Sequence, residues 1–147
     1  MKFIQFTTRF SILFMIGFLF LGMRQTQVYT VKFKITNIRN NKGQIQLQFY
    51  KDETNFKAEK PYKEIYLSKE AVKNNYMEYT VEIPGGLYGF AMLDDENSNR
   101  KMDYGILPKE GFAFSNYYHT AWTRPKFDDF KMNITKDTYV VMKFRYV

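Results

Sequence analysis

The sequence predicts an all-β protein: an antiparallel β-sandwich of immunoglobulin-like type, preceded by an apolar N-terminal signal helix. Three observations support this fold class. Apolar and polar residues alternate with a period of two from residue 27 onward, turn-forming residues separate the alternating runs, and 147 residues suit about one domain. Hydrophobic residues make up 45% of the chain and charged residues 25%, which is typical of a globular protein and argues against disorder.

The first predicted strand shows the alternation clearly, because Val31, Phe33 and Ile35 are separated by Lys32 and Lys34. Such alternation indicates strands with one buried and one solvated face, which are typically antiparallel. We expect about seven strands, over residues 28–37, 44–50, 63–68, 76–83, 87–93, 129–135 and 138–146, with helical turns near 55–60 and 68–73. The remaining long stretch, 94–128, lacks the pattern, and loops of that length are usually functional or tightly packed.

Residues 1–24 have the pattern of a secretory signal peptide. Lys2 and Arg9 precede an almost wholly apolar run over residues 10–22, which is shorter than the roughly 20 residues of a membrane-spanning helix. Because no typical cleavage site of small residues follows, an uncleaved N-terminal anchor is the alternative. We therefore expect an exported protein, periplasmic, secreted or envelope-associated, whose residues 25–147 form a single β-sandwich domain.

The composition narrows the classes of function. The chain has no Cys and a single His, which excludes disulfides, cysteine nucleophiles and multi-histidine metal sites. Residues 1–24 hold three bases and no acid, so the remainder carries only four of the seven net positive charges. Those charges are mixed with acids, and no basic run suggests a nucleic-acid partner.

An acidic loop follows the fifth predicted strand. The oxygen-bearing residues fall at alternate positions, as in the calcium loop of an EF-hand: Asp95, Asn97, Asn99, Lys101 (through its carbonyl) and Asp103. The pattern predicts a candidate Ca²⁺ site, the one cofactor that the sequence suggests. Arg100 stands at the usual glycine position, however, and Ile106 at the position of the bidentate Glu. The alternative is a polar loop whose Asn and Asp side chains cap their own backbone.

A second part of the irregular stretch is rich in aromatic residues. They are Phe112, Phe114, Tyr117, Tyr118 and Trp122, with Phe127 nearby. If exposed, they could form a platform for a sugar or a peptide; if buried, they would close one end of the sandwich. Both interpretations stay open at this point.

Catalytic residues are not indicated. Ser115, His119 and Asp128 are the residue types of a hydrolase triad, but no nucleophile-elbow motif surrounds the serine. A glycosidase pair would need a defined separation across a cleft, and its candidates are the carboxylates of Asp94, Asp95, Glu96, Asp128 and Asp129. We therefore expect a protein that is not an enzyme.

Four segments together resemble a known family. They are residues 83–88 (IPGGLY), 94–103 (DDENSNRKMD), 105–116 (GILPKEGFAFSN) and 125–130 (PKFDDF). Their order and spacing resemble the bacterial family called domain of unknown function 2141, over about residues 30–147. The resemblance implies an exported single-domain β-sandwich without an established activity. The turn at 84–88 is also similar to transthyretin-like (prealbumin-like) and Cna-B-like sandwiches, a likeness that implies a prealbumin-like fold and no function. Asp94 and Arg100 depart from the family, which often has His and Gly there.

Three hypotheses for function follow. The first is a non-enzymatic exported β-sandwich with a binding or structural role in the bacterial cell envelope, whose partner is an envelope protein or a glycan. The second is a calcium-assisted module that binds carbohydrate or peptide through the 95–103 acidic loop and the 112–127 aromatic loop. The third is a hydrolase. None involves nucleic acid, and the membrane enters only through an uncleaved N-terminal segment.

Overall fold

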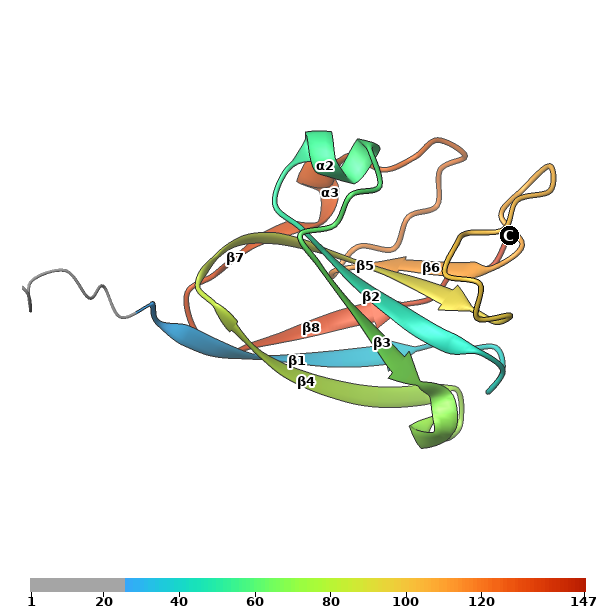
Figure 1. The fold of residues 1–147 in the computed structure, drawn as a ribbon, viewed down its shortest axis with the longest axis horizontal. Helices are drawn as coiled ribbons and strands as arrows, with labels where there is room; N and C mark the ends of the chain where they lie inside the picture. Colours follow the sequence, from blue (N-terminus) through green and yellow to red (C-terminus); the bar gives the residue numbers. More distant parts are fainter. Residues whose placement is uncertain (1–25) are drawn as a thin grey trace, which may run out of the picture.

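The structure, a computed structural model, describes residues 26–147. The predicted signal helix and anchor lie outside these described residues. Eight strands form two sheets that face each other (Figure 1). They are β1 (Val28–Thr36), β2 (Gln44–Tyr50), β3 (Lys63–Ser68), β4 (Tyr76–Pro84), β5 (Gly86–Asp95), β6 (Gly111–Phe114), β7 (Lys131–Ile134) and β8 (Thr138–Lys143). The helices are short: α2 (Glu53–Lys57), α3 (Phe127–Phe130) and a 3₁₀ turn, η1 (Lys69–Ala71). The all-β prediction is confirmed, and within residues 26–147 no helix is long and apolar enough to cross a membrane.

The smaller sheet has the order β4-β1-β8, and the larger has the order β3-β2-β5-β6, with β7 pairing with the first half of β5. All pairs are antiparallel except β1 and β8, which are parallel. The predicted antiparallel arrangement is wrong at this one pair. The turn at 135–137 carries the chain from β7 in one sheet to β8 in the other, so these consecutive strands do not form a hairpin.

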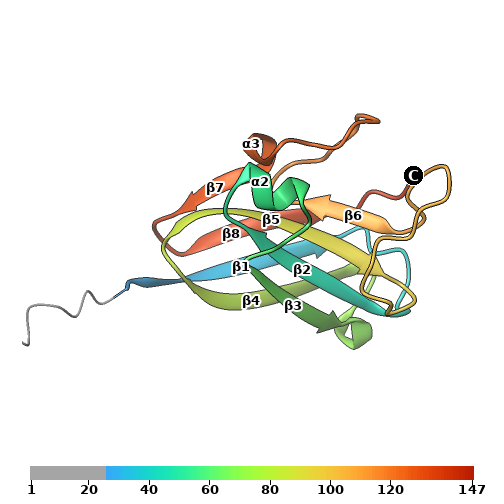
Figure 2. The ribbon, with the colours of Figure 1, turned by 45° about the horizontal axis from the view of Figure 1, so that its top comes forward.

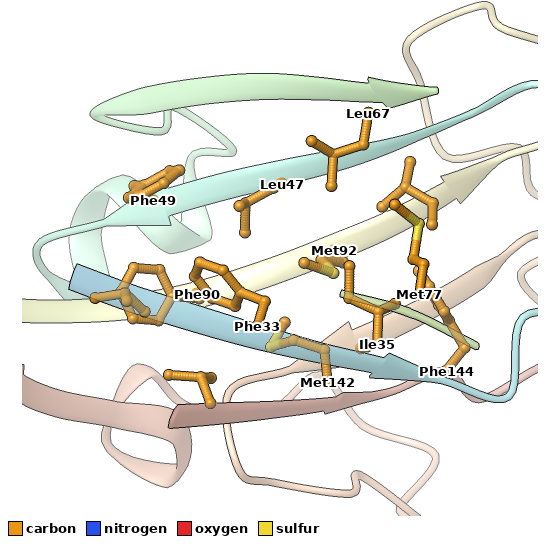
Figure 3. Packing of buried hydrophobic residues seen from close by; sticks show 14 of the residues in the cluster. Phe33, Ile35, Leu47, Phe49, Leu67, Met77, Phe90, Met92, Met142 and Phe144 are labelled. Carbon is orange, nitrogen blue, oxygen red and sulfur yellow. The ribbon is translucent and has the colours of Figure 1, made fainter. Parts of the chain in front are cut away.

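The main core fills the space between the sheets, because the apolar residues of each alternating strand face inward. Phe90 packs edge-on against Phe33 and Phe49, with ring centroids 5.0 and 5.3 Å apart. Figure 3 shows this packing, with residues of both sheets pointing toward one another. Burial of these side chains is the largest favourable term in folding.

Strand β6 lies inside the stretch predicted to be irregular. It has only four residues, and its small residue Ala113 faces the core while Phe112 and Phe114 face the opposite side. Its backbone also bonds to the C-terminal segment, where the Phe112 amide donates to the Arg145 carbonyl at 3.1 Å. This pairing closes the sandwich on the side of β6 and β8.

A second layer covers the outer face of the larger sheet. The helices α2 and α3 and the loops 96–110 and 115–126 lie on this face (Figures 1 and 2). Asp52 caps α2 by accepting a hydrogen bond from the Asn55 amide at 2.8 Å, and the helix buries Phe56. Phe56 packs against Phe130 of α3 at 4.9 Å between ring centroids. The helices and loops are therefore packed onto the sheet through a small second hydrophobic core.

Candidate functional site

A cleft of about 640 Å³ opens on the outer face of the larger sheet. Side chains of β2, β3, β5 and β6 form its floor. Residues 100–108 form one wall, and residues 119–125 with the α2 region form the other. The cleft exists because the outward-facing residues of the sheet are only partly covered by the second layer.

The floor carries a chain of hydrogen-bonded polar side chains. Tyr50 donates its hydroxyl to Gln48 Oε1 at 3.0 Å, and Gln48 Nε2 donates to Glu64 Oε1 at 2.9 Å. Tyr66 donates to the other oxygen of Glu64 at 2.9 Å. Burial raises the pKa of the Tyr50 hydroxyl to about 12, so that this group stays a neutral donor at ordinary pH. The floor therefore offers donors and acceptors in fixed positions.

Arg100 forms part of the first wall, and its guanidinium lies 4.6 Å above the ring of Tyr66. Its φ of +65° is in the left-handed region, which costs a non-glycine residue roughly 1–2 kcal/mol. The glycine expected here from the family pattern would adopt this angle freely. The chain thus holds a cation at the cleft in a strained conformation.

Arginines also support the opposite wall. Arg124 stacks on Phe56 at 4.5 Å and pairs with Glu59 at 3.1 Å, which ties the 119–125 segment to the α2 region. Arg145 donates to the carbonyls of His119 and Ala121 at 2.9 and 3.1 Å. These bonds fix the loop that carries Trp122.

Trp122 is the single tryptophan of the chain, lines the cleft and is 78% exposed. Tyr104, on the other wall, is 64% exposed. Exposed large aromatic side chains at the edge of a concave surface are typical of binding sites. The cleft therefore has aromatic surfaces at both walls above a polar floor.

The predicted aromatic residues separate into two groups. Phe112 and Trp122 line the cleft, as does Phe114, which is only 8% exposed and belongs to the second core. Tyr117 packs against that core and contacts His119. Tyr118 lies under Lys143 of β8 and is not part of the lining. Both interpretations from the sequence apply, since some of these rings are buried and others exposed.

Asp95, the first residue of the predicted calcium loop, is fully buried and accepts four hydrogen bonds. The donors are the side chains of Gln44 and Gln46 and the amides of Asn99 and Arg100, at 2.8–3.0 Å. Burial alone would raise the pKa of Asp95, but these hydrogen bonds outweigh it and hold the pKa below its ordinary value. The carboxylate thus ties the loop to β2.

The other predicted calcium ligands bond to one another. Asn97 donates to Asp103 at 2.6 Å, the Asn99 amide donates to the Asn97 side chain at 3.0 Å, and the Lys101 amide donates to the Asn99 side chain at 2.8 Å. These are the bonds of a self-capped polar loop, the alternative drawn from the sequence. Within residues 26–147 no group of three or more His, Asp or Glu side chains is arranged to hold a metal ion.

Asp94 faces the other way and forms a buried ion pair with Lys69 at the end of the main core. Tyr146 donates its hydroxyl to Asp94 Oδ2 at 2.5 Å, and the Lys69 ammonium donates to the Lys42 carbonyl at 2.8 Å. Burial raises the pKa of Asp94, against the opposing effects of Lys69 and Tyr146. The lysine was not identifiable from the sequence, since it follows a strand among other exposed polar residues.

The residue types of a hydrolase triad each have other partners. Ser115 is buried and donates to the Phe130 carbonyl at 2.7 Å. His119 contacts the Thr123 carbonyl, and Asp128 pairs with Lys131 at 2.8 Å. These contacts are structural, since each holds a loop or helix end in place.

Gln48, Tyr50, Arg124 and Arg145 were not predicted as site residues. The alternating glutamines of β2 indicated a polar face. Nothing in the local pattern indicated that loops more than 50 residues later in the chain would form walls around this face.

Residues 33–141 match the family described as "Uncharacterized protein conserved in bacteria (DUF2141)". Comparison with curated proteins gave no match, and neither did comparison with solved structures. The match spans most of the chain, from β1 into β8, and includes both walls of the cleft. The chain therefore belongs to this bacterial family, as the four sequence segments indicated.

Proposed function

We propose that this protein is a non-enzymatic binding module of the bacterial cell envelope, and that its ligand lies in the cleft on the larger sheet. The observation that carries the proposal is the cleft itself: about 640 Å³, with a hydrogen-bonding floor and the exposed Trp122 at its wall. Concave sites of this size that combine aromatic surface with a few fixed polar groups are typical of ligand binding.

We also propose that the protein is not an enzyme. This part of the proposal is supported by the contacts of Ser115, His119 and Asp128, each of which hydrogen-bonds to a separate structural partner. The two carboxylates of the cleft are also engaged, Glu59 with Arg124 and Glu64 with Gln48. Groups held in this way suit the positioning of a ligand better than proton transfer.

The export of the protein is likewise proposed, from the signal-like pattern of residues 1–24. Fractionation of bacteria that express the full chain tests it: we expect the protein outside the cytoplasm, and a variant lacking residues 2–24 inside it. A full-length chain found in the cytoplasm would contradict export.

The single tryptophan provides a direct test of binding. Trp122 fluorescence would be titrated with a panel of neutral oligosaccharides, acidic oligosaccharides and short peptides. Binding in the cleft is expected to shift the emission to the blue and to protect the ring from iodide quenching, because the exposed indole loses contact with water.

A matched reporter on the opposite side of the molecule is the control. Trp122→Phe combined with Tyr139→Trp moves the reporter to β8, whose residue 139 is exposed. This variant should give no shift with the same probes. A panel in which no member changes Trp122 emission would contradict the proposed function.

A further inference from the structure

The cleft carries more cationic than acidic side chains. The residues Arg100, Lys101, Arg124 and Arg145 line it together with two acids, Glu59 and Glu64. Within residues 26–147, Arg124 forms an ion pair with Glu59, whereas Arg100 and Arg145 form none. Arg100 stacks on Tyr66, and Arg145 donates from one nitrogen, Nη1, to two carbonyls. Guanidinium groups with remaining donors are suited to binding a carboxylate.

The strain at Arg100 is an independent observation. Its left-handed backbone angle would favour glycine. Seven non-glycine residues within 26–147 have such an angle, and of these only Arg100 and Glu59 line the cleft, where a strained residue is a pointer to function. The Arg100 amide also donates to Asp95 Oδ2 at 2.9 Å, so the buried carboxylate holds this turn in place. The cation is thereby fixed at the cleft rather than free on a flexible loop.

The floor of the cleft indicates which groups the ligand carries besides a negative charge. Strands β2 and β5 have hydrogen-bonded neighbours on both sides, and β6 bonds to β5 and to the C-terminal segment. Among the floor strands of residues 26–147, only β3, at the margin of the floor, has an open edge. A peptide therefore cannot add as a strand among β2, β5 and β6, and recognition over this part of the floor uses side chains. The hydroxyl, amide and carboxylate groups of Tyr50, Gln48 and Glu64 match the hydroxyl groups of a sugar, and Trp122 offers a flat surface for a sugar ring.

We propose that the ligand is an acidic oligosaccharide, one whose sugar rings bear carboxylate groups, with Arg100 binding a carboxylate and the polar floor binding ring hydroxyls. This inference rests on the proposed function, because it names the ligand class of the same cleft. An acidic peptide is the competing occupant, and the experiment separates the two.

The test compares three probes by Trp122 fluorescence: an oligogalacturonate, its carboxyl-reduced neutral counterpart, and a glutamate-rich peptide of similar charge. We expect the oligogalacturonate to bind at least tenfold more tightly than the neutral sugar or the peptide, and its affinity to fall as salt is added. Equal affinity of the acidic and neutral sugars, or preferential binding of the peptide, would overturn the inference and leave the proposed function intact. No response to any probe, or to the wider panel, would overturn both.

Arg100→Gly tests the residue without endangering the fold. Glycine relieves the left-handed strain, which offsets the greater freedom of glycine in the unfolded chain, so the unfolding temperature should stay close to that of the wild type. Affinity for oligogalacturonate should fall about tenfold to a hundredfold, the size of one charge-assisted hydrogen bond. Arg100→Lys should retain part of the affinity for oligogalacturonate, because it keeps the positive charge.

Asn74→Gly is the matched control, since Asn74 has a similar angle, φ +52°, outside the cleft lining. This variant should bind like the wild type. If Arg100→Gly also binds oligogalacturonate like the wild type, the assignment of Arg100 is overturned.

Discussion

A buried ion pair makes the stability of this protein sensitive to mutation at two residues. Lys69 and Asp94 are 1% and 0% exposed and form an ion pair. Lys69→Met should destabilise the fold by about 3–5 kcal/mol, because it leaves a carboxylate buried without its cation. Urea unfolding of the single variant and of Lys69→Met/Asp94→Leu measures this effect. The double variant should recover most of the loss, and a double variant as unstable as the single one would contradict the explanation.

Asp95 makes the stability of the fold depend on pH in the acidic range. Its pKa is lower in the folded than in the unfolded chain, where an aspartate titrates near 3.9, so its stabilising contribution is complete above that pH and is lost as pH falls through the folded value. Asp95→Asn should lower stability at neutral pH by roughly 1–3 kcal/mol and flatten the acid limb of the stability curve.

Urea unfolding from neutral pH down to about pH 3 measures both effects of Asp95→Asn. The exposed Glu82→Gln is the control and should retain the wild-type curve. An unchanged acid limb in Asp95→Asn would show that other carboxyl groups carry the dependence.

At the scale of the element, the second core explains why such short helices hold their place. α2 has five residues and would not be stable alone, so its position depends on the burial of Phe56 against Tyr50 and Phe130. Phe56→Ala should cost about 3–5 kcal/mol, the usual loss for a buried aromatic side chain. It should also loosen the wall of the cleft, since Arg124 stacks on this ring.

Thermal unfolding together with iodide quenching of Trp122 measures both consequences of Phe56→Ala. The exposed Thr54→Ala is the matched control on the same helix. A Phe56→Ala variant with wild-type stability would contradict the role assigned to the second core.

The seven expected strands correspond to β1, β2, β3, β4, β5, β7 and β8. Alternation indicates a strand with one buried face, whereas β5 is buried on both faces along most of its length. The eighth, β6, was missed because its alternation is inverted: Ala113 faces the main core, and Phe112 and Phe114 face the second layer. The sequence left the aromatic group open between a binding platform and a buried lid, and in the structure Trp122 and Phe112 line the cleft while Phe114 is buried in the second core. Arg124 and Arg145 could not be predicted, because their positions depend on contacts with residues far away in the sequence.

For the molecule as a whole, the hydrogen bonds of the loop 95–103 determine whether metal ions should change its stability. The loop's carboxylates already accept hydrogen bonds from amides within the fold. We therefore expect EDTA and millimolar Ca²⁺ to leave the unfolding temperature of the full chain unchanged. A rise of several degrees with Ca²⁺, abolished by Asp103→Asn, would establish binding to the native state and restore the calcium-assisted alternative.

β1 lies at the centre of the smaller sheet, and one of its two neighbours is β8, whose paired residues are 107 positions further along the chain. This sheet therefore cannot be completed until the last strand has been synthesised. Contacts between such distant segments form slowly, and until β8 pairs, one edge of β1 keeps unpaired backbone groups that chaperones can shield. Under the export proposed above, a chain whose smaller sheet is closed by β8 stays unfolded until β8 has crossed the membrane.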